Sequence, residues 1–184
     1  MSAVQAWRWS ADAYETAAVS GVFGDGARVE LIGGEVYQAA AMLPRHATTV
    51  RRLRQQLAGV DAQRWTLDTQ TPVRLSASSE PEPDLWVARG PLDGYLDRHP
   101  TPADLVVVVE VADTSLAYDR GVKLPAYATA LVGEVWIVSL PEQCLHRYLD
   151  PIGGRYQTVQ TLVDGALTVA GVEVAIQAIL PPAE

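Results

Sequence analysis

Cysteine is nearly absent from this sequence, which has one, Cys144, among 184 residues. A single cysteine excludes a disulfide within the chain and the cysteine-based zinc sites, which need several thiolates. We expect Cys144 to pack as a small hydrophobic side chain in or near a strand.

The sequence also lacks an apolar run that could cross a membrane. Its longest run, residues 105–109, has the length of a strand, whereas a membrane span needs about 18 to 20 residues. The first twenty residues include Arg8, Asp12 and Glu15 and have no apolar stretch like that of a secretory signal. These observations predict a cytoplasmic protein without a membrane partner.

Basic residues are few: 14 lysines and arginines stand against 22 acidic residues, giving a formal net charge of −8 and a pI of about 4.8. Proteins that bind nucleic acid usually carry a basic surface, so this balance argues against such a partner. The objection is incomplete, because a metal-dependent nuclease needs clustered carboxylates, and its metal offsets part of their charge.

The chain contains no internal repeat, low-complexity tract or long linker, and its 48% of apolar residues can form a substantial core. We therefore expect one domain over residues 1–184. The patterns predict helices at residues 10–19, 46–57 and within 119–131, strands at 65–75, 84–88, 104–111 and 134–139, a hairpin at 145–149 and 155–160, and a strand with a short helix at 169–179. Because the apolar run at 104–111 is continuous, we expect that strand to be covered on both faces. Strand, helix and strand from 104 to 139 suggest a parallel crossover, so the predicted class is α/β with a mixed, α+β type sheet.

Residues 28–38 have the clearest local pattern, two alternating runs around Gly33 and Gly34, which is typical of a β-hairpin. Counting outward from the turn places Ile32 opposite Glu35 and Glu30 opposite Tyr37. Side chains alternate along a strand, so Glu30 and Glu35 share a face. Two carboxylates there would repel each other unless water or a cation separates them.

Three charged residues occupy positions where charge is costly. Asp84 opens an apolar strand, Glu110 lies near the end of the most apolar strand, and Lys123 lies early in the following helix. A carboxylate in such a place must be paired, protonated or bound to a metal. If the two strands are neighbours, both carboxylates lie at one sheet edge, where they could hold Mg²⁺ with Lys123 nearby. The alternative is structural: Asp84 caps a turn, Glu110 pairs with a basic residue, and Lys123 is solvated.

The order of these residues resembles the Uma2-type family of bacterial proteins, which has the restriction-endonuclease-like PD-(D/E)XK fold. The resemblance covers roughly residues 8–178 and rests on an ordered set of short stretches. These are the hairpin at 29–36, Pro44-Arg-His46 with its helix, Pro83-Asp84, the strand at 105–111, the helix at 118–127 and the strand at 134–138. The resemblance implies a nuclease core with an N-terminal and a C-terminal hairpin, and a metal-dependent endonuclease that cuts DNA.

The resemblance also assigns roles. Asp84 and Glu110 would hold Mg²⁺ or Mn²⁺, Lys123 would be the catalytic lysine, and Glu30 an accessory acid. The usual lysine position, two residues after Glu110, is Ala112 here, so Lys123 replaces it from the helix. The family makes a homodimer plausible. An alternative is a nuclease fold that has lost turnover and only binds nucleic acid or protein.

Two further residues are candidates for substrate contact. His46 lies on the apolar stripe of its helix, where a buried, hydrogen-bonded histidine is the competing interpretation. Arg51, with Arg52 and Arg54, could contact phosphates, although a run of charge on a helix is usually a solvated face. Asp119 and Lys123 are spaced to pair along a helix. Pro125 predicts that this helix begins near residues 122–123 or is kinked there.

Overall fold

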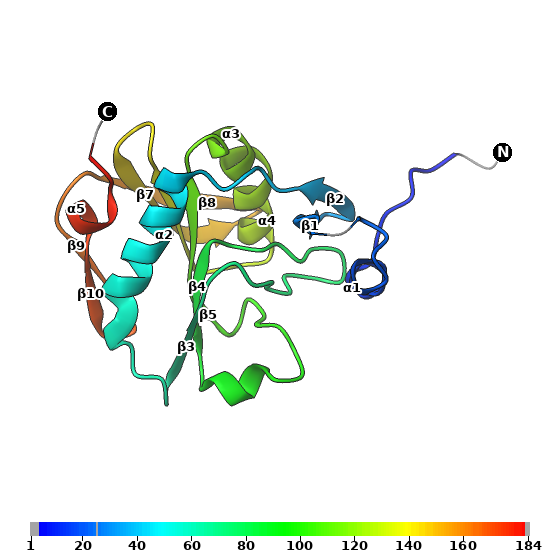
Figure 1. Ribbon diagram of the computed structural model, residues 1–184, viewed down its shortest axis with the longest axis horizontal. Coiled ribbons are helices and arrows are strands. Elements are labelled where there is room, and N and C mark those ends of the chain that lie inside the picture. Colours follow the sequence, from blue (N-terminus) through cyan, green and yellow to red (C-terminus); the bar gives the residue numbers. More distant parts are fainter. Residues whose placement is uncertain (1–3, 25, 183–184) are drawn as a thin grey trace.

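A six-stranded mixed sheet forms the middle of the molecule, with the strand order β3-β4-β5-β6-β7-β8 (Figure 1). The computed structural model describes residues 4–24 and 26–182. The sheet strands are β3 (Trp65–Asp68), β4 (Leu85–Arg89), β5 (Leu105–Ala112), β6 (Glu134–Ser139), β7 (Cys144–Ile152) and β8 (Arg155–Leu162). β5 and β6 are parallel, and the other neighbouring pairs are antiparallel. The predicted mixed sheet and the parallel pair are therefore confirmed.

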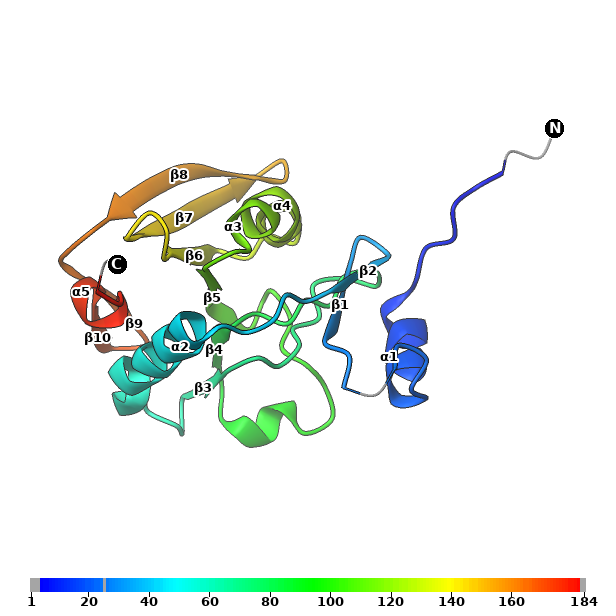
Figure 2. The ribbon, with the colours of Figure 1, turned by 45° about the horizontal axis from the view of Figure 1, so that its top comes forward.

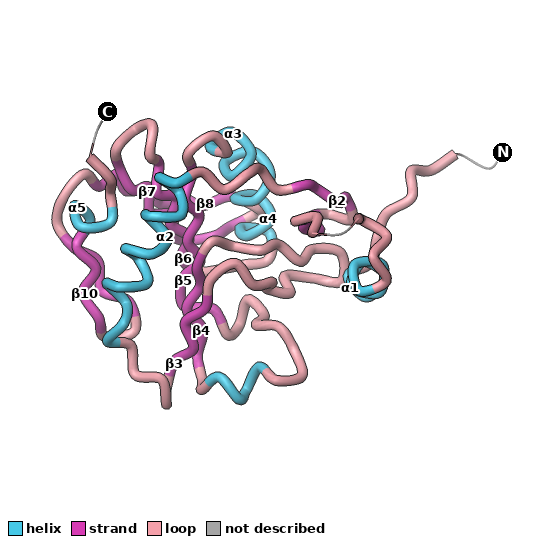
Figure 3. Tube along the Cα trace, in the orientation of Figure 1, coloured by secondary structure: helices cyan, strands magenta, loops and turns pink. Residues whose placement is uncertain are grey.

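The remaining elements are helices and two small hairpins. They are α1 (Ala11–Val19), β1 (Val29–Ile32), β2 (Glu35–Gln38), α2 (Pro44–Gln56), η1 (Leu57–Gly59), η2 (Leu92–Tyr95), α3 (Leu116–Tyr118), η3 (Asp119–Lys123), α4 (Leu124–Thr129), β9 (Ala166–Val169), β10 (Val172–Ala175) and α5 (Ile176–Ile179). α1 and the β1-β2 hairpin lie to one side of the sheet (Figure 1). In Figure 3, α2 and the connection formed by α3, η3 and α4 lie on opposite sides of the sheet. α5 and the β9-β10 hairpin lie on the α2 side (Figure 2).

The valine-rich strand β5 is buried on both faces, as its continuous apolar run predicts. Val107 and Val109 pack into a core with α2, α5 and the β9-β10 hairpin. Val108 and Ala112 point to the opposite face and pack against residues of α4. Because side chains alternate along a strand, Glu110 also points to this second face.

The helical connection from β5 to β6 contains a π-helical turn, η3, between α3 and α4. Pro125 stands at the start of α4 and accounts for this irregularity. Proline has no N–H, and in a regular α-helix its ring would clash with the carbonyl of Gly121 four residues earlier. A wider π turn avoids this conflict. The second of the two expectations for Pro125 is confirmed: the helical segment starts at Leu116, and a π turn interrupts it just before α4 begins at Leu124.

The N-terminal helix and hairpin follow their predictions closely. Ser10 caps α1, and its side chain accepts a hydrogen bond from the amide of Ala13. β1 and β2 pair in the predicted register over Gly33 and Gly34, whose φ angles of 60° and 80° favour glycine. A β-bridge between Leu31 and Glu80 attaches β1 to the loop before β4.

Other boundaries differ from expectation. The strand expected at 65–75 ends at Asp68, because Gln70 has a φ of 55° and its amide bonds to the carbonyl of Pro83, outside the regular ladder. Asp84 precedes β4, which begins at Leu85. The tail forms a hairpin, β9-β10, before its short helix, where the sequence predicts a single strand. Within the described residues, no helix combines the length and apolarity that a membrane crossing requires.

Candidate active site

Asp84 and Glu110 lie side by side at one end of the central strands. Leu85 of β4 is opposite Val109 of β5 in an antiparallel pair. The residue before Leu85 therefore lies beside the residue after Val109, which brings the two carboxylates together. Both residues are buried, with 9% of Asp84 and 2% of Glu110 exposed.

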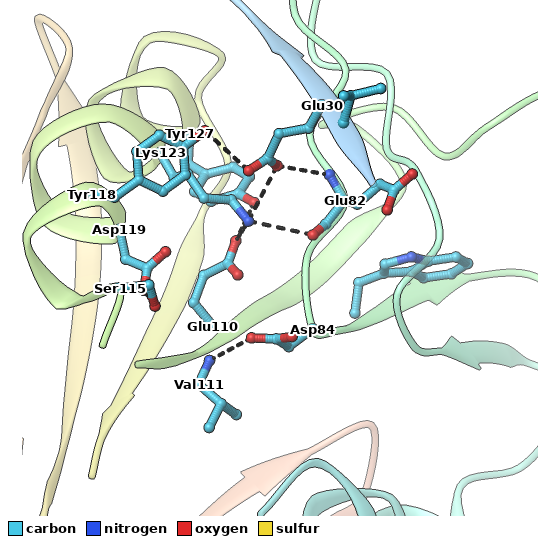
Figure 4. A network of polar contacts seen from close by, with 12 residues as sticks. Glu30, Glu82, Asp84, Glu110, Val111, Ser115, Tyr118, Asp119, Lys123 and Tyr127 are labelled. Atoms are coloured by element: carbon cyan, nitrogen blue, oxygen red, sulfur yellow. Dashed lines mark hydrogen bonds and ion pairs between the residues drawn. The ribbon is translucent and has the colours of Figure 1, made fainter. Parts of the chain in front are cut away.

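Lys123 reaches this pair from the π turn η3 on the second face of the sheet (Figure 4). Its ammonium nitrogen lies 2.7 Å from Oε1 of Glu110 and 3.3 Å from Oε2 of Glu30. It also donates to the carbonyl oxygen of Glu82 at 3.3 Å. The lysine is 4% exposed, so these contacts replace its hydration.

Glu30 enters the site from the β1-β2 hairpin. It is 5% exposed and accepts hydrogen bonds from the Tyr118 hydroxyl at 3.0 Å and from the Glu82 amide at 3.1 Å. Glu35, the other acid on this hairpin, is exposed and pairs with Arg8 outside the site. The structure therefore separates two acids that the register alone places on one face.

His46 lies at the N-terminal end of α2 and contacts Asp84 from the opposite side. Its Nε2 is 3.0 Å from Oδ2 of Asp84, and the same oxygen accepts a hydrogen bond from the Val111 amide at 2.8 Å. The other ring nitrogen, Nδ1, is buried and has no hydrogen-bond partner among the described residues. His46 is thus positioned to orient Asp84.

A cavity opens above these side chains, and its volume is about 670 Å³ including the part open to solvent. Glu30, His46, Asp84, Glu110, Asp119 and Lys123 are among the residues that line it. Arg51 does not line it and lies exposed on α2. Asp119 accepts a hydrogen bond from Ser115 at 2.6 Å, whereas the ion pairs of Lys123 go to Glu110 and Glu30. The spacing that would align Asp119 with Lys123 on an α-helix is altered by the π turn.

The charges in the site influence one another strongly. Burial raises the pKa of Glu110 well above its ordinary value, and Asp119, Asp84 and Glu30 add to this effect while Lys123 opposes it. Burial alone would lower the pKa of Lys123, but the carboxylates led by Glu110 and Glu30 outweigh it and raise this pKa. Lys123 therefore remains a cation at neutral pH.

Asp84 and Asp119 respond to burial differently. For Asp84, burial is outweighed by the hydrogen bond and charge of His46, the charge of Lys123 and the Val111 amide, so its pKa is lowered. For Asp119, burial dominates and raises the pKa to about 6. Asp84 is therefore the acid in this group most strongly held in its ionised form.

The donor atoms fit a hard divalent cation. Within the described part of the chain, the hydrogen bonds and ion pairs of these carboxylates use Oδ2 of Asp84 and Oε1 of Glu110. Oδ1 and Oε2 remain for another ligand. Mg²⁺ and Mn²⁺ prefer oxygen donors and are usually held by one or two carboxylates with water.

Residues 11–179 match the model of the protein family Uma2, described as "Putative restriction endonuclease". The chain belongs to the Uma2 family. The predicted resemblance is thereby confirmed over most of the chain. No curated protein matches it.

A solved structure has the same fold as this Uma2-family chain. It is a protein of Anabaena variabilis, described as "a putative nuclease belonging to DUF820", with a TM-score of 0.62 and 12% identity. The similarity covers 83% of this chain and 89% of the other. At this identity the comparison establishes the fold, and it confirms the predicted nuclease-like architecture.

Three contributors to the site were not predicted from the sequence of this Uma2-family chain. The Tyr127 hydroxyl donates to Oε1 of Glu110 at 2.5 Å. Tyr118 binds Glu30, and the backbone of Glu82 contacts both Glu30 and Lys123. Backbone groups leave no signal in residue identity. The helical spacing from Lys123 to Tyr127 could have indicated a shared direction.

Proposed function

We propose that this protein is a metal-dependent endonuclease that hydrolyses phosphodiester bonds, with DNA as its substrate. One observation carries the proposal: Asp84, Glu110 and Lys123, from three separate elements, meet at one cavity with Glu30 beside them. The Uma2 family and the nuclease fold support a nuclease-type function.

Asp84 and Glu110 would hold the cation, Mg²⁺ or Mn²⁺, through the oxygens that face the cavity. When bound, the cation supplies Lewis acidity toward phosphate and toward water. His46 and the Val111 amide fix the orientation of Asp84, and Tyr127 fixes that of Glu110. These contacts hold both carboxylates ready for a cation, so little rearrangement is needed when it binds.

Lys123 acts as a fixed positive charge. Its raised pKa favours the protonated form, so it stabilises negative charge that develops on the phosphate and does not serve as a general base. Glu30 and the Glu82 carbonyl hold the ammonium in place. The role of accessory acid for Glu30 is therefore to position Lys123.

A DNA backbone could leave the cavity along α2. His46 lines the cavity, and Arg51 stands five residues further along the helix, roughly 7.5 Å at 1.5 Å per residue. In this arrangement His46 would lie near the phosphate being cut. Arg51 is turned roughly 140° around the helix from His46, so it would contact only DNA that passes outside the cavity. The cation and these side chains would locally offset the acidic net charge.

Cleavage assays test the proposal. Supercoiled plasmid and single- and double-stranded DNA and RNA should be incubated with purified protein and Mg²⁺ or Mn²⁺. We expect metal-dependent DNA cleavage that is lost in Asp84→Asn, Glu110→Gln and Lys123→Met but kept in Asp164→Asn, an exposed acid outside the cavity. Absence of cleavage with every substrate and metal would refute the enzymatic function. Calorimetry with Mn²⁺ would then show whether the fold still binds metal.

A further inference from the structure

A second cluster of metal-ligating side chains lies on the same face of the sheet as the candidate active site. It consists of Glu142 in the turn after β6, and Cys144 and His146 on β7. The three donor atoms, Oε2, Sγ and Nε2, lie within 4.8 Å of one another. Cys144 and His146 are two residues apart on a strand, so both side chains point to one face.

The sheet register relates this cluster to the first site. Glu110 is paired with Ile137, Ile137 with His146, and His146 with Thr161. Paired side chains point to the same face, so Glu110 and His146 both face the helical connection, two strand spacings or roughly 10 Å apart. None of Glu142, Cys144 and His146 lines the cavity of the candidate active site, so this cluster is a separate site.

A cation already occupies the cluster. Nη2 of Arg120 lies 2.6 Å from Oε2 of Glu142 and 2.7 Å from Nε2 of His146. Nε2 of His146 also lies 2.7 Å from Oε2 of Glu142, and its Nδ1 lies 3.1 Å from Oγ1 of Thr161. With a metal in place of the guanidinium, Nε2 would be the ligand atom and Nδ1–H would donate to Thr161, which would fix the orientation of the ring.

We propose that Glu142, Cys144 and His146 form a mixed zinc-type site, in which a divalent transition metal replaces the Arg120 guanidinium. This site needs one thiolate only, unlike the several-thiolate sites that a single cysteine excludes. Zn²⁺ and Co²⁺ accept such a set of ligands, which consists of one thiolate, one imidazole, one carboxylate and a water molecule. The ion takes up Cys144 as thiolate, and the thiol proton passes to solvent. The donor set is softer than the all-oxygen set of the first site, so the two sites select different metals.

The geometry requires small adjustments only. Metal–ligand bonds of about 2.0 to 2.3 Å at tetrahedral angles place donors roughly 3.3 to 3.8 Å apart. Here Sγ lies 3.2 Å from Nε2 and 4.0 Å from Oε2, and Nε2 lies 2.7 Å from Oε2. The Arg120 side chain is 35% exposed, so it can swing into solvent.

Cobalt spectroscopy tests the site, because Cys144 is the only cysteine in the sequence and any thiolate–cobalt charge-transfer band must come from it. Metal-free full-length protein should be titrated with Co²⁺ and then with Zn²⁺. We expect a near-ultraviolet band that saturates at one Co²⁺ per chain and disappears when Zn²⁺ is added. Absence of the band at saturating Co²⁺ overturns the proposal.

Matched variants separate this site from the first one. Cys144→Ser should abolish the band, and His146→Gln should weaken Co²⁺ binding by roughly 100-fold, with circular dichroism confirming the fold. Arg120→Ala should tighten binding, since it removes the competing cation. Glu110→Gln, which alters only the oxygen site, should leave the band unchanged. Loss of the band in Glu110→Gln, or an unchanged band in His146→Gln, would contradict the proposed site. Both outcomes are independent of the nuclease assays.

Discussion

The ammonium nitrogen of Lys123 lies 2.7 Å from Oε1 of Glu110, the same oxygen that accepts the Tyr127 hydroxyl. All three side chains are buried between β5 and the helical connection. Glu110 thus has one oxygen engaged by two donors, while its other oxygen has no hydrogen bond or ion pair among the described residues.

NMR can test the charge of one buried residue, Lys123. It is the only lysine in the sequence, so protein labelled with ¹³C-lysine has a single lysine side-chain signal. The surrounding carboxylates raise its pKa, so its Cε shift should stay constant up to a pH above the ordinary lysine value of 10.5. NMR titration measures this directly. A midpoint below the ordinary value would show that burial prevails and that Lys123 could act as a base.

Much of the fold could be predicted from local patterns. The β1-β2 register follows from two glycines, and the double-sided burial of β5 follows from its unbroken apolar run. Asp84, Glu110 and Lys123 stood out because a charge within or beside apolar elements needs a partner. Their meeting depended on β4 pairing with β5, which spacing alone does not specify.

The remaining features depend on tertiary contacts. A tyrosine in an apolar helix is usually a packing residue. The hydroxyl of Tyr127 becomes part of the site only because Glu110 lies next to it and accepts its hydrogen bond. Glu30 and Glu35 share a hairpin face in sequence, but packing against Tyr118 and Glu82 buries the first and leaves the second exposed. Local periodicity contains no information about these neighbours.

The two hairpin acids provide a matched pair of variants. Glu30→Gln removes a charge that stabilises the Lys123 ammonium, so the lysine pKa should fall and cleavage should slow by roughly 10- to 100-fold. Glu35→Gln, on the same hairpin, loses only an exposed pair with Arg8 and should match the wild type. Lysine NMR and cleavage rates measure both effects. Equal cleavage rates for the two variants would show that Glu30 has no role in catalysis.

Tyr127→Phe tests whether the hydroxyl positions Glu110. Losing this buried hydrogen bond should lower the free energy of unfolding by about 1 to 3 kcal/mol and weaken Mn²⁺ binding. Tyr156→Phe is the control, since its hydroxyl donates to the Val132 carbonyl at 2.7 Å, away from the metal ligands. Urea unfolding should show a comparable loss for both variants, while calorimetry should show weaker Mn²⁺ binding only for Tyr127→Phe. Unchanged Mn²⁺ affinity in Tyr127→Phe would show that this tyrosine contributes to packing and does not position Glu110.

The pH dependence of stability tests the buried state of Asp119. Burial raises its pKa from the ordinary 3.8 to about 6 in the folded protein. Between these values the folded state binds more protons than the unfolded state, so this group makes the free energy of unfolding fall as pH rises. Asp119→Asn removes the titrating carboxyl and can keep a hydrogen bond with Ser115. Its stability relative to the wild type should therefore increase from pH 4 to pH 7, by at most about 3 kcal/mol.

Urea unfolding in the presence of a chelator at several pH values measures this difference without interference from metal. Asp164→Asn serves as the control, because that acid is exposed and its substitution should give a difference that does not vary with pH. If Asp119→Asn behaves like Asp164→Asn, the carboxyl of Asp119 titrates as it does in water. The effect of burial on Asp119 would then be cancelled by the charge of Lys123 and the hydrogen bond from Ser115, which both favour the ionised carboxylate.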